Sequence, residues 1–304
     1  MKTNRRNFLK AVGMGTALVG LGGLSTLCTS NKTKSNQMKT KAVLNIAFQE
    51  WTTPQKELNA KLDFMEGLGV VGLELSGRNL ANRVNEFQQA LRNRNIKISA
   101  ICAGFEGWLL ADDPVIKEQC ISSTKEILAA AGQLGSVGMI LVPAFNSQKS
   151  FPHTMETRER LVADLHMLGE FAHQHNTCLI LEPLNRQEAF YLRQVADAAS
   201  ICRDVNGSGI ACMGDFWHMT WEENSDQGAF ISGGNFLKHV HIASRKRRSM
   251  PGEDGQADNY IDGFKGLKAL DYQGHISFEC GSQGDPLQTI PAAVKLIREQ
   301  WEMA

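Results

Sequence analysis

The feature that most constrains this chain is a regular alternation of short apolar runs with segments of helical spacing, from residue 43 onward. Segments such as VNEFQQALRNRN and ETRERLVADLHMLGEFAHQHN repeat apolar residues at intervals of three and four, as amphipathic helices do. Near-continuous apolar strands separated by such helices indicate a parallel sheet covered by helices. The runs with the length and content of strands are residues 43–49, 70–76, 96–105, 138–145, 177–185, 210–219, 237–244 and 275–281.

Eight strand and helix pairs predict an α/β fold of the (β/α)8 TIM-barrel type, which usually takes about 250 residues. With 304 residues and 42% hydrophobic content, the chain can bury the core of such a barrel. An open, doubly wound sheet is the alternative. No G-x-G-x-x-G follows the first run, so the dinucleotide-binding version of that sheet lacks its main signature.

The charge balance and the cysteines narrow the class of partner and the chemistry. Lys and Arg total 32, as do Asp and Glu, so no net charge favours nucleic acid or an anionic membrane surface as a partner. A small molecule is therefore the more plausible partner.

The seven cysteines are odd in number and lack zinc spacing, and several lie in apolar runs. This pattern indicates buried apolar side chains rather than disulfides. These are Cys102, Cys178 and Cys212.

The N-terminal region has a different composition from the rest. Arg5 and Arg6 precede a Gly-rich apolar run, and the order RRNFLK resembles a twin-arginine export signal over residues 1–28. Cys28 is a candidate for lipid attachment, although Leu27 replaces the small residue that lipoprotein processing prefers. Residues 29–42 are polar and predict a linker before a domain at 43–304. We therefore expect an exported protein, periplasmic or anchored on the periplasmic side of the membrane.

Polar residues end several of the predicted strands. The runs five to eight end on or beside Glu182, Asp215, His241 and Glu279. In a barrel, the carboxyl ends of the strands form the active face. Taken singly, each residue could be a solvated charge or a hydrogen-bonded core group. Their equivalent places in a repeat favour one shared site. Three converging carboxylates repel each other, and a divalent ion such as Mn²⁺, Mg²⁺ or Co²⁺ removes that cost, with Zn²⁺ also open.

The segments EPLNRQE, GDFWHM, HVHIAS and FECG, in this order, resemble the xylose isomerase-like TIM barrel superfamily. The similarity is to its sugar phosphate isomerase/epimerase branch, which includes ketose 3-epimerases and hydroxypyruvate isomerases. It covers residue 43 to the C-terminus and is strongest from the fifth run. The resemblance implies that Glu182, Asp215, His241 and Glu279 bind one divalent metal. It also implies that Glu182 and Glu279 are catalytic and exchange a substrate proton through an enediolate. Barrels of this branch commonly pair, which leaves a homodimer open.

The same resemblance implies residues that bind the substrate. By their places in the motifs, Glu188, His218 and Arg247 match a substrate-binding Glu, His and Arg. The chain departs from the epimerase pattern after His241, where it has Ala243, Ser244 and Arg245 in place of acidic and Asn residues. This departure concerns the distal part of the sugar pocket. The neighbours Arg245, Lys246 and Arg248 are interpreted as a solvated basic loop.

Two residues near the earlier strands are further candidates for substrate binding. Glu74 ends the second run and is expected to line the pocket. Trp108 follows the third run and is either a platform for a sugar ring or a loop anchor. His173 and His175 are interpreted as polar residues at a helix C-terminus, where the helix dipole favours them.

These patterns predict a metal-dependent sugar isomerase or epimerase that acts on a ketose or keto-sugar. The expected partner is a small carbohydrate and not nucleic acid. One alternative keeps the site but eliminates a glycosidic substituent, because proton abstraction beside a ketone also permits β-elimination. Another is a sugar-binding barrel without catalysis. An AP-endonuclease-type nuclease would need further His ligands and a basic surface, which the sequence does not indicate.

Overall fold

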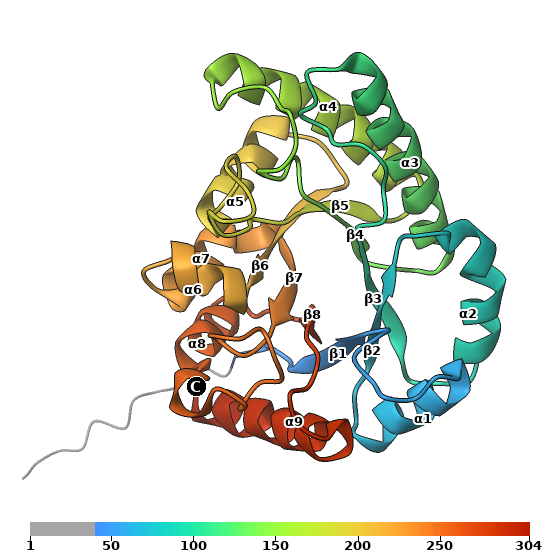
Figure 1. The fold of residues 1–304 in the computed structure, drawn as a ribbon, viewed down its shortest axis with the longest axis vertical. Coiled ribbons are helices and arrows are strands. Elements are labelled where there is room, and N and C mark those ends of the chain that lie inside the picture. The colour runs from blue at the N-terminus through green and yellow to red at the C-terminus, as the bar shows by residue number, and fades with distance from the viewer. Residues whose placement is uncertain (1–39) are drawn as a thin grey trace, which may run out of the picture. The chain divides into compact units, whose positions relative to one another are not determined.

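Eight parallel strands close into a barrel in chain order, and the helices lie outside this ring (Figure 1). The computed structural model describes residues 40–304. The predicted (β/α)8 TIM-barrel fold is confirmed, because β8 pairs in parallel with β1 and completes the ring. The strands are β1 (Asn45–Gln49), β2 (Gly72–Ser76), β3 (Lys97–Cys102), β4 (Gly138–Leu141), β5 (Cys178–Leu181), β6 (Ile210–Asp215), β7 (Leu237–Ile242) and β8 (His275–Phe278).

Two of the outer helices begin with the same local signal. Asp113 before α3 and Asp285 before α9 each accept a hydrogen bond from the backbone N–H two residues later, and a proline follows each aspartate. Proline suits this first helical position because its missing N–H would have no partner there. The helices are α1 (Leu58–Gly67), η2 (Leu80–Arg83), α2 (Val84–Leu91), α3 (Pro114–Gln133), α4 (Met155–Gln174), α5 (Val195–Val205), α6 (Phe216–Glu222), α7 (Asp226–Gly233), η3 (Gly234–Phe236), η4 (Gly255–Ala257), α8 (Ile261–Ala269) and α9 (Pro286–Met303).

The sixth strand is shorter than its apolar run. The run continues to residue 219, but β6 ends at Asp215 and α6 begins at the next residue. The Asp215 side chain accepts a hydrogen bond from Trp217 N at 2.8 Å, which caps the new helix. Apolar content alone could not reveal this boundary, because a buried helical turn and a buried strand have similar composition.

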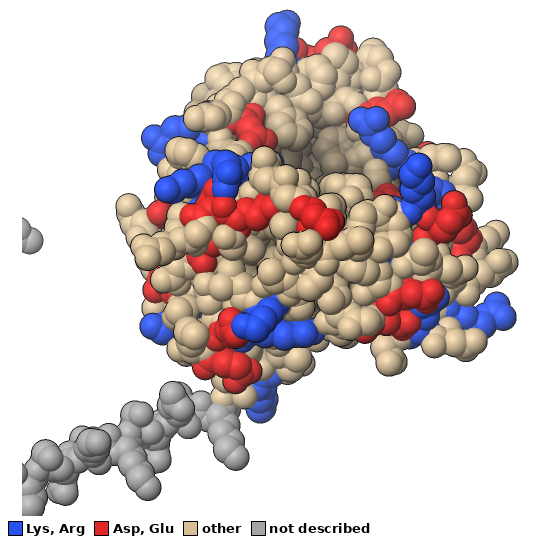
Figure 2. Space-filling model, turned by 60° about the horizontal axis from the view of Figure 1, so that its bottom comes forward, with Lys and Arg blue, Asp and Glu red and all other residues tan. Residues whose placement is uncertain are grey.

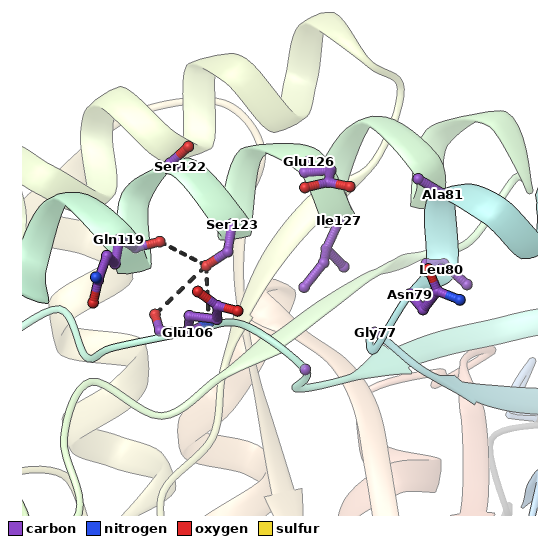
Figure 3. Close-up of a pocket in the computed structure, with 11 residues that line it drawn as sticks. Gly77, Asn79, Leu80, Ala81, Glu106, Gln119, Ser122, Ser123, Glu126 and Ile127 are labelled. Carbon is purple, nitrogen blue, oxygen red and sulfur yellow. Dashed lines mark hydrogen bonds between the residues drawn. The ribbon is translucent and has the colours of Figure 1, made fainter.

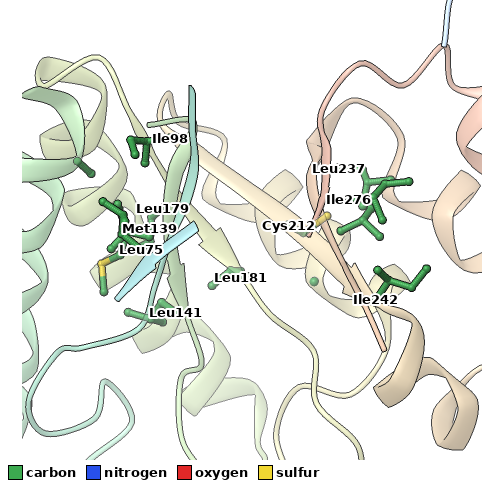
Figure 4. Packing of buried hydrophobic residues seen from close by; sticks show 14 of the residues in the cluster. Leu75, Ile98, Met139, Leu141, Leu179, Leu181, Cys212, Leu237, Ile242 and Ile276 are labelled. Atoms are coloured by element: carbon green, nitrogen blue, oxygen red, sulfur yellow. The ribbon is translucent and has the colours of Figure 1, made fainter. Parts of the chain in front are cut away.

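The outward faces of the strands form the main hydrophobic core with the surrounding helices. Side chains alternate along a strand, so every second residue points out of the barrel. In β5, Leu179 and Leu181 point outward, and Ile242 in β7 and Ile276 in β8 do the same (Figure 4). All four are fully buried. The nearly unbroken apolar runs follow from this arrangement, because both faces of each strand are covered.

The inward faces differ between the two halves of the ring. From β3 to β6 they form a separate apolar cluster of Ala100, Ile140, Ile180, Ala211 and Met213. From β7 through β8 and β1 to β2, the inward positions include buried polar side chains, namely His239, Ser277, Gln49 and Glu74. The barrel interior is therefore apolar on one side and polar on the other.

The cysteines of the described part of the chain carry free thiols. Cys212 is buried, as predicted, while Cys102 and Cys178 are half-buried. Burial raises the pKa of the Cys120 and Cys178 thiols to about 12, so both stay protonated near neutral pH. The interpretation of these cysteines as small apolar side chains rather than disulfide partners is confirmed for residues 40–304.

The predicted export signal at 1–28, including Cys28, lies outside the described residues, and so does most of the linker. The last residues of that linker are attached to the barrel. Lys41 N donates to Asp271 Oδ1 at 2.7 Å, and the Thr40 hydroxyl donates to the Lys268 carbonyl at 2.9 Å. Chain contacts with the barrel thus begin three residues before the predicted start of the domain. Among the helices of residues 40–304, none combines the length and apolarity that a membrane span requires.

Candidate active site

Four residues at the carboxyl ends of consecutive strands converge on one point. They are Glu182 after β5, Asp215 at the end of β6, His241 in β7 and Glu279 after β8. One oxygen or nitrogen from each lies within 4.8 Å of those of the other three. The side chains of Glu182, Asp215 and His241 are buried, and that of Glu279 is half-buried. The structure therefore brings together the set that the sequence singled out.

The backbone explains why these side chains face inward. Asp215 is paired with His241 across β6 and β7. Glu182 N donates to Leu141 O, and Glu279 N donates to Ile242 O, both at 3.2 Å, so these two residues continue the pattern of the sheet. Each residue stands two positions after an inward-facing neighbour, and side chains at this spacing share one face of a strand. The repeat of strand and turn thus sets four polar groups at one level of the barrel.

The donor atoms of this cluster suit a divalent cation. His241 Nδ1 lies 2.8 Å from Glu279 Oε2 and 3.4 Å from Glu182 Oε1. These close contacts lack the geometry of hydrogen bonds, so among the described residues the buried atoms Glu182 Oε1 and His241 Nδ1 have no hydrogen-bond partner. Buried polar atoms are rarely left unpaired in native proteins, so such a pair calls for a ligand. Three carboxylates and one imidazole fit Mn²⁺, Mg²⁺ or Co²⁺, and the side chains present are therefore compatible with the expected metal.

The pKa values within the cluster move in different directions. Burial raises the pKa of Glu182, and repulsion from Glu279 adds to that rise. Burial also acts to raise the pKa of Glu279, but the charges of His241 and Arg248 outweigh it and lower this pKa to about 2. Burial acts to lower the pKa of His241, yet Glu74 and Glu279 hold it well above its ordinary value. The concentrated negative charge therefore favours cations at this end of the barrel.

His218 and Glu188 lie beside the four converging residues. The ring nitrogen His218 Nδ1 accepts a hydrogen bond from Asn185 N at 3.1 Å, which leaves the proton of the neutral ring on Nε2. That Nε2 is 3.5 Å from Asp215 Oδ2 and has no hydrogen-bond partner among the described residues. Asn185 also donates to Glu188 Oε1 at 3.1 Å. His218 therefore presents a buried N–H donor, and Glu188 a half-exposed carboxylate, beside the metal-ligand set.

The basic loop after β7 corrects one predicted residue. Arg247, expected to hold a substrate oxygen, is 53% exposed and bonded through Nε to Asp254 Oδ1 at 2.6 Å, away from the site. Arg248 reaches the site instead, with Nη2 at 2.6 Å from Glu279 Oε2 and 3.4 Å from Asp215 Oδ2. The φ angle of Arg248 is +54°, in the left-handed region, so its side chain points in a different direction from that of a residue with negative φ. Residues 245–248 are all basic, so the sequence alone could not show which of them faces the site.

Arg245, interpreted from the sequence as a solvated residue, is buried and structural. Its guanidinium donates to Phe216 O at 2.7 Å, pairs with Asp226, and lies 4.9 Å from the centre of the Phe216 ring and of the Tyr260 ring. A buried guanidinium needs several acceptors, and this one has them. Arg245 therefore ties the start of α6 to the loop after β7.

Trp217 is an aromatic residue of the site that the sequence did not single out. The centre of its ring lies 4.6 Å from the Arg248 guanidinium carbon and 4.9 Å from the centre of the His218 ring, and the two rings are inclined at 68°. By contrast, Trp108 donates its indole N–H to Lys149 O at 3.1 Å and joins two loops. The structure thus favours the loop-anchor interpretation of Trp108. In the sequence, Trp217 lies between Asp215 and His218 in GDFWHM, and this position could have indicated that it belongs to the site.

The side chain of Glu74, which we expected to line the pocket, is fully buried. Its oxygens accept from Gln49 Nε2 at 2.8 Å, and they lie 2.7 Å from His239 Nε2 and 2.9 and 3.0 Å from His241 Nε2. Glu74 therefore lies beneath His241 in the polar half of the barrel. Its place at the end of a strand suggested the pocket, but its carboxylate contacts Gln49 of β1 and the two histidines of β7 inside the barrel.

One face of the molecule shows basic and acidic side chains without a concentration of either charge (Figure 2). Figure 2 shows a hollow with mainly uncharged visible walls, and basic and acidic side chains are interspersed around it. A separate pocket of about 330 Å³ lies beside α3 and contains Glu106 and Glu126, with Ser123 hydrogen-bonded to the Glu106 backbone (Figure 3). None of the converging residues lines that pocket. His173 and His175 lie at the C-terminus of α4, as predicted.

Comparison with known proteins gives consistent results. The family model described as xylose isomerase-like TIM barrel matches residues 62–300. The 3-dehydro-D-guloside 4-epimerase of Escherichia coli K12 is 30% identical over 250 residues, which are 78% of this chain and 93% of that protein. The L-ribulose 3-epimerase of Methylomonas sp. is 29% identical over 128 residues, 42% of this chain and 44% of that enzyme.

Solved structures resemble the barrel over most of its length. The 3-keto-D-glucoside 4-epimerase of E. coli, in its apo form, superposes with a TM-score of 0.77 at 25% identity, covering 84% of this chain and all of that one. The D-psicose 3-epimerase of Clostridium cellulolyticum superposes with a TM-score of 0.74 at 17% identity, covering 85% and 99%. At that identity the second match supports the fold alone.

Proposed function

Because the chain belongs to the xylose isomerase-like TIM barrel family, we propose that it is a divalent-metal-dependent sugar epimerase. The observation that carries this proposal is the convergence of Glu182, Asp215, His241 and Glu279, with one donor atom of each inside 4.8 Å. The related enzymes are sugar epimerases, which are isomerases, and their substrates are small carbohydrates. The proposed partner is accordingly a small carbohydrate.

The proposed substrate is a glycoside that carries a ketone on its sugar ring. The relative that aligns over most of its length acts on a 3-dehydro-guloside, and the solved structure at 25% identity is that of a 3-keto-glucoside 4-epimerase. The ketose 3-epimerases align over less than half of this chain. A ketone makes the hydrogen on the neighbouring carbon acidic, so the configuration at that carbon can be inverted. A free ketose is the second substrate class to test.

The proposed reaction is a proton exchange between two faces of one carbon. A divalent ion held by the four residues would supply positive charge against the enediolate that forms when this carbon loses its proton. One of the carboxylates of Glu182 and Glu279 takes the proton from one face, and the other gives a proton to the opposite face. No redox partner is needed, because the electron pair of the broken C–H bond returns to the same carbon. If the proton goes to the neighbouring carbon instead, the product is the isomeric aldose or ketose.

Neighbouring side chains would position the sugar for this exchange. The free N–H of His218 and the carboxylate of Glu188 are suited to sugar hydroxyl groups, because one donates and the other accepts. The Arg248 guanidinium takes the role first assigned to Arg247 and also orients Glu279, which it contacts at 2.6 Å. The indole of Trp217, under Arg248, offers an apolar surface for a sugar ring.

The experiment that tests the proposal is deuterium incorporation followed by NMR. The full-length protein, loaded with Mn²⁺, would be incubated in D₂O with a panel of 3-keto-glycosides and ketoses. A parallel sample would contain the same sugars without the enzyme. We expect deuterium at a carbon beside the ketone, together with a new epimer. Metal-loaded protein that exchanges no deuterium in any sugar would contradict the proposal and favour a sugar-binding barrel without catalysis.

The second candidate reaction at the same site is β-elimination. It is considered because the E. coli 4-epimerases act on glycosides, which carry a leaving group. An enediolate adjacent to a carbon that bears a glycosidic oxygen can expel that oxygen as the leaving group. The deuterium experiment separates the two outcomes. Release of the free aglycone from a 3-keto-glycoside would identify a lyase, whereas an intact glycoside with inverted configuration would identify an epimerase.

We also propose that the chain is exported by the twin-arginine route and works in the periplasm. The support is the order of Arg5 and Arg6 before an apolar run. Replacing both arginines by lysine should leave the protein in the cytoplasm with its first 28 residues attached, as cell fractionation and mass spectrometry would reveal. Unchanged export would contradict the route. A fatty acyl mass that Cys28→Ala removes would identify a lipid anchor.

A further inference from the structure

The polar half of the barrel interior contains a second cluster directly beneath the proposed metal ligands. Glu74, His239 and His241 lie with their polar atoms within 4.8 Å of one another, and all three are buried. His241 belongs to both clusters, because its Nδ1 faces Glu182 and Glu279 while its Nε2 faces Glu74. One imidazole therefore connects the mouth of the barrel to the layer below it.

We propose that Glu74 is a positioning residue that holds His241 in the orientation and the tautomer needed to bind a metal. This inference rests on the proposed function, since it concerns the same site. Glu74 Oε1 and Oε2 lie 2.9 and 3.0 Å from His241 Nε2, so that nitrogen donates its hydrogen to the carboxylate. A neutral imidazole carries one hydrogen, so donation from Nε2 leaves the Nδ1 lone pair free for the cation.

Glu74 itself has no access to a sugar. Its side chain is fully buried, and it pairs with Gln49 across β1 and β2. Its carboxylate receives hydrogen bonds from Gln49 at 2.8 Å and lies 2.7 Å from His239 Nε2, in addition to His241. Three nitrogen atoms from two strands, β1 and β7, therefore fix the position of this carboxylate. A group held so firmly can in turn fix the ring that it contacts.

The energetic cost of this arrangement argues for a role in the site. An ionised carboxylate buried without exposure is expensive unless it is paired and hydrogen-bonded. The Glu74 carboxylate is hydrogen-bonded by Gln49 and contacts His239 and His241, and these partners offset the cost. On the opposite side of the barrel interior, apolar residues such as Ile140 and Ile180 fill the space without such a cost. The polar cluster lies on the side of the interior where Glu74 contacts His241.

Glu74→Gln is the sharpest substitution because it preserves the size of the side chain. A carboxylate accepts through both oxygens, whereas the amide offers one accepting oxygen and an NH₂ group that donates. The three donors around Glu74 then compete for one oxygen, and the NH₂ group opposes at least one imidazole N–H. The His241 ring loses its preferred tautomer, although the volume of the layer is unchanged.

The first test is the affinity for Mn²⁺, measured by titration calorimetry on the full-length protein without sugar. We expect Glu74→Gln to weaken binding by about 10-fold to 100-fold, the usual effect of removing a partner of a metal-bound histidine. Ser277→Ala is the matched control, because this buried hydroxyl also belongs to the polar half of the interior and has no hydrogen-bond partner among the described residues. That variant should bind Mn²⁺ as tightly as the unaltered protein.

The second test needs no variant and therefore does not depend on whether Glu74→Gln folds. Nitrogen-15 NMR of the unaltered protein loaded with diamagnetic Mg²⁺ or Zn²⁺ should show His241 with its hydrogen on Nε2. A hydrogen on Nδ1 would overturn the proposal. So would equal Mn²⁺ affinity in a folded Glu74→Gln variant. Two equivalents of metal in the unaltered protein, reduced to one in the variant, would also overturn it, because Glu74, His239 and His241 would then form a metal site of their own.

The outcome separates this inference from the proposed activity. If the unaltered protein epimerises a keto-sugar and Glu74→Gln binds Mn²⁺ normally, only the positioning role fails. If no sugar in the panel reacts but Mn²⁺ affinity depends on Glu74, only the proposed activity fails. Both measurements are made on the same protein preparation.

Discussion

The two halves of the barrel interior share one backbone architecture and differ in chemistry. Between β3 and β6 the inward side chains are apolar, with Ile140 paired to Ile180 across β4 and β5. Between β7 and β2 the interior contains Gln49 and His239, which contact the Glu74 carboxylate at 2.8 and 2.7 Å. A layer of a barrel can be filled by either kind of residue, so the fold does not require the polar half.

The difference indicates a division of roles. Apolar burial contributes about 25 cal/mol for each Å² removed from water, so the apolar half stabilises the barrel. Burying polar groups costs free energy, and their hydrogen bonds only offset that cost. The polar half lies under His241 and Glu279, which suggests that it supports the site. Substitutions in the two halves should therefore affect different properties.

The largest effect is expected at the mouth of the polar half. Glu279→Gln removes one of the two proposed proton-transfer groups, and general acid or base groups contribute about 10²-fold to 10⁴-fold to a rate. We expect deuterium exchange into the substrate to fall by about 10³-fold. Glu106→Gln, at the separate pocket beside α3, is the control and should react normally. An active Glu279→Gln enzyme would exclude this residue from proton transfer.

The apolar half should respond in the opposite way. Ile140→Ala removes a fully buried side chain and leaves a cavity, which lowers the free energy of unfolding by about 2–5 kcal/mol. Strand β4 carries none of the proposed site residues, so the folded variant should keep its turnover. Urea unfolding and the deuterium assay measure the two properties. A variant with normal stability and no activity would break the division between the halves.

Arg248 and Arg247 provide a comparison of neighbours in one loop. Arg248→Ala removes a charged hydrogen bond to Glu279, worth about 1.5–3 kcal/mol, so kcat/KM should fall about 10-fold to 100-fold. Arg247→Ala removes an exposed ion pair, for which about 0–1 kcal/mol is usual, and should leave kcat/KM nearly unchanged. Equal losses in both variants would show that the loop as a whole, and not Arg248, acts on the site.

The smallest predicted effect is a dependence of stability on pH in the polar half. Burial, with repulsion from His239, lowers the pKa of His275 from 6.5 to about 4. The unfolded chain therefore takes up a proton between these values before the folded protein does, and stability present above pH 6.5 is lost as the pH falls toward 4. From pH 8 to pH 5.5 this group should cost about 1 kcal/mol.

Urea unfolding of the unaltered protein and of His275→Asn at both pH values measures this contribution. The variant should lose about 1 kcal/mol less on acidification. An equal loss in the two proteins would assign the pH dependence to other groups of the polar half.

The sequence by itself determined the barrel and the level at which the polar groups lie. Eight apolar runs with helices between them permit few other folds, and the period of two along a strand places Glu182, Asp215 and Glu279 on inward faces. The convergence of these residues with His241 was therefore predictable, because the barrel repeats one unit and equivalent positions fall at one level.

Only the tertiary structure decided the features that depend on single turns or on contacts between distant strands. Whether Arg247 or Arg248 faces Glu279 is set by one left-handed φ angle, and a shift by one residue reverses the direction of a side chain. Glu74 and His241 are 167 residues apart, and their hydrogen bond exists only because the barrel closes between β8 and β1. Local patterns contain the period of each strand, but not the three-dimensional neighbours that closure brings together.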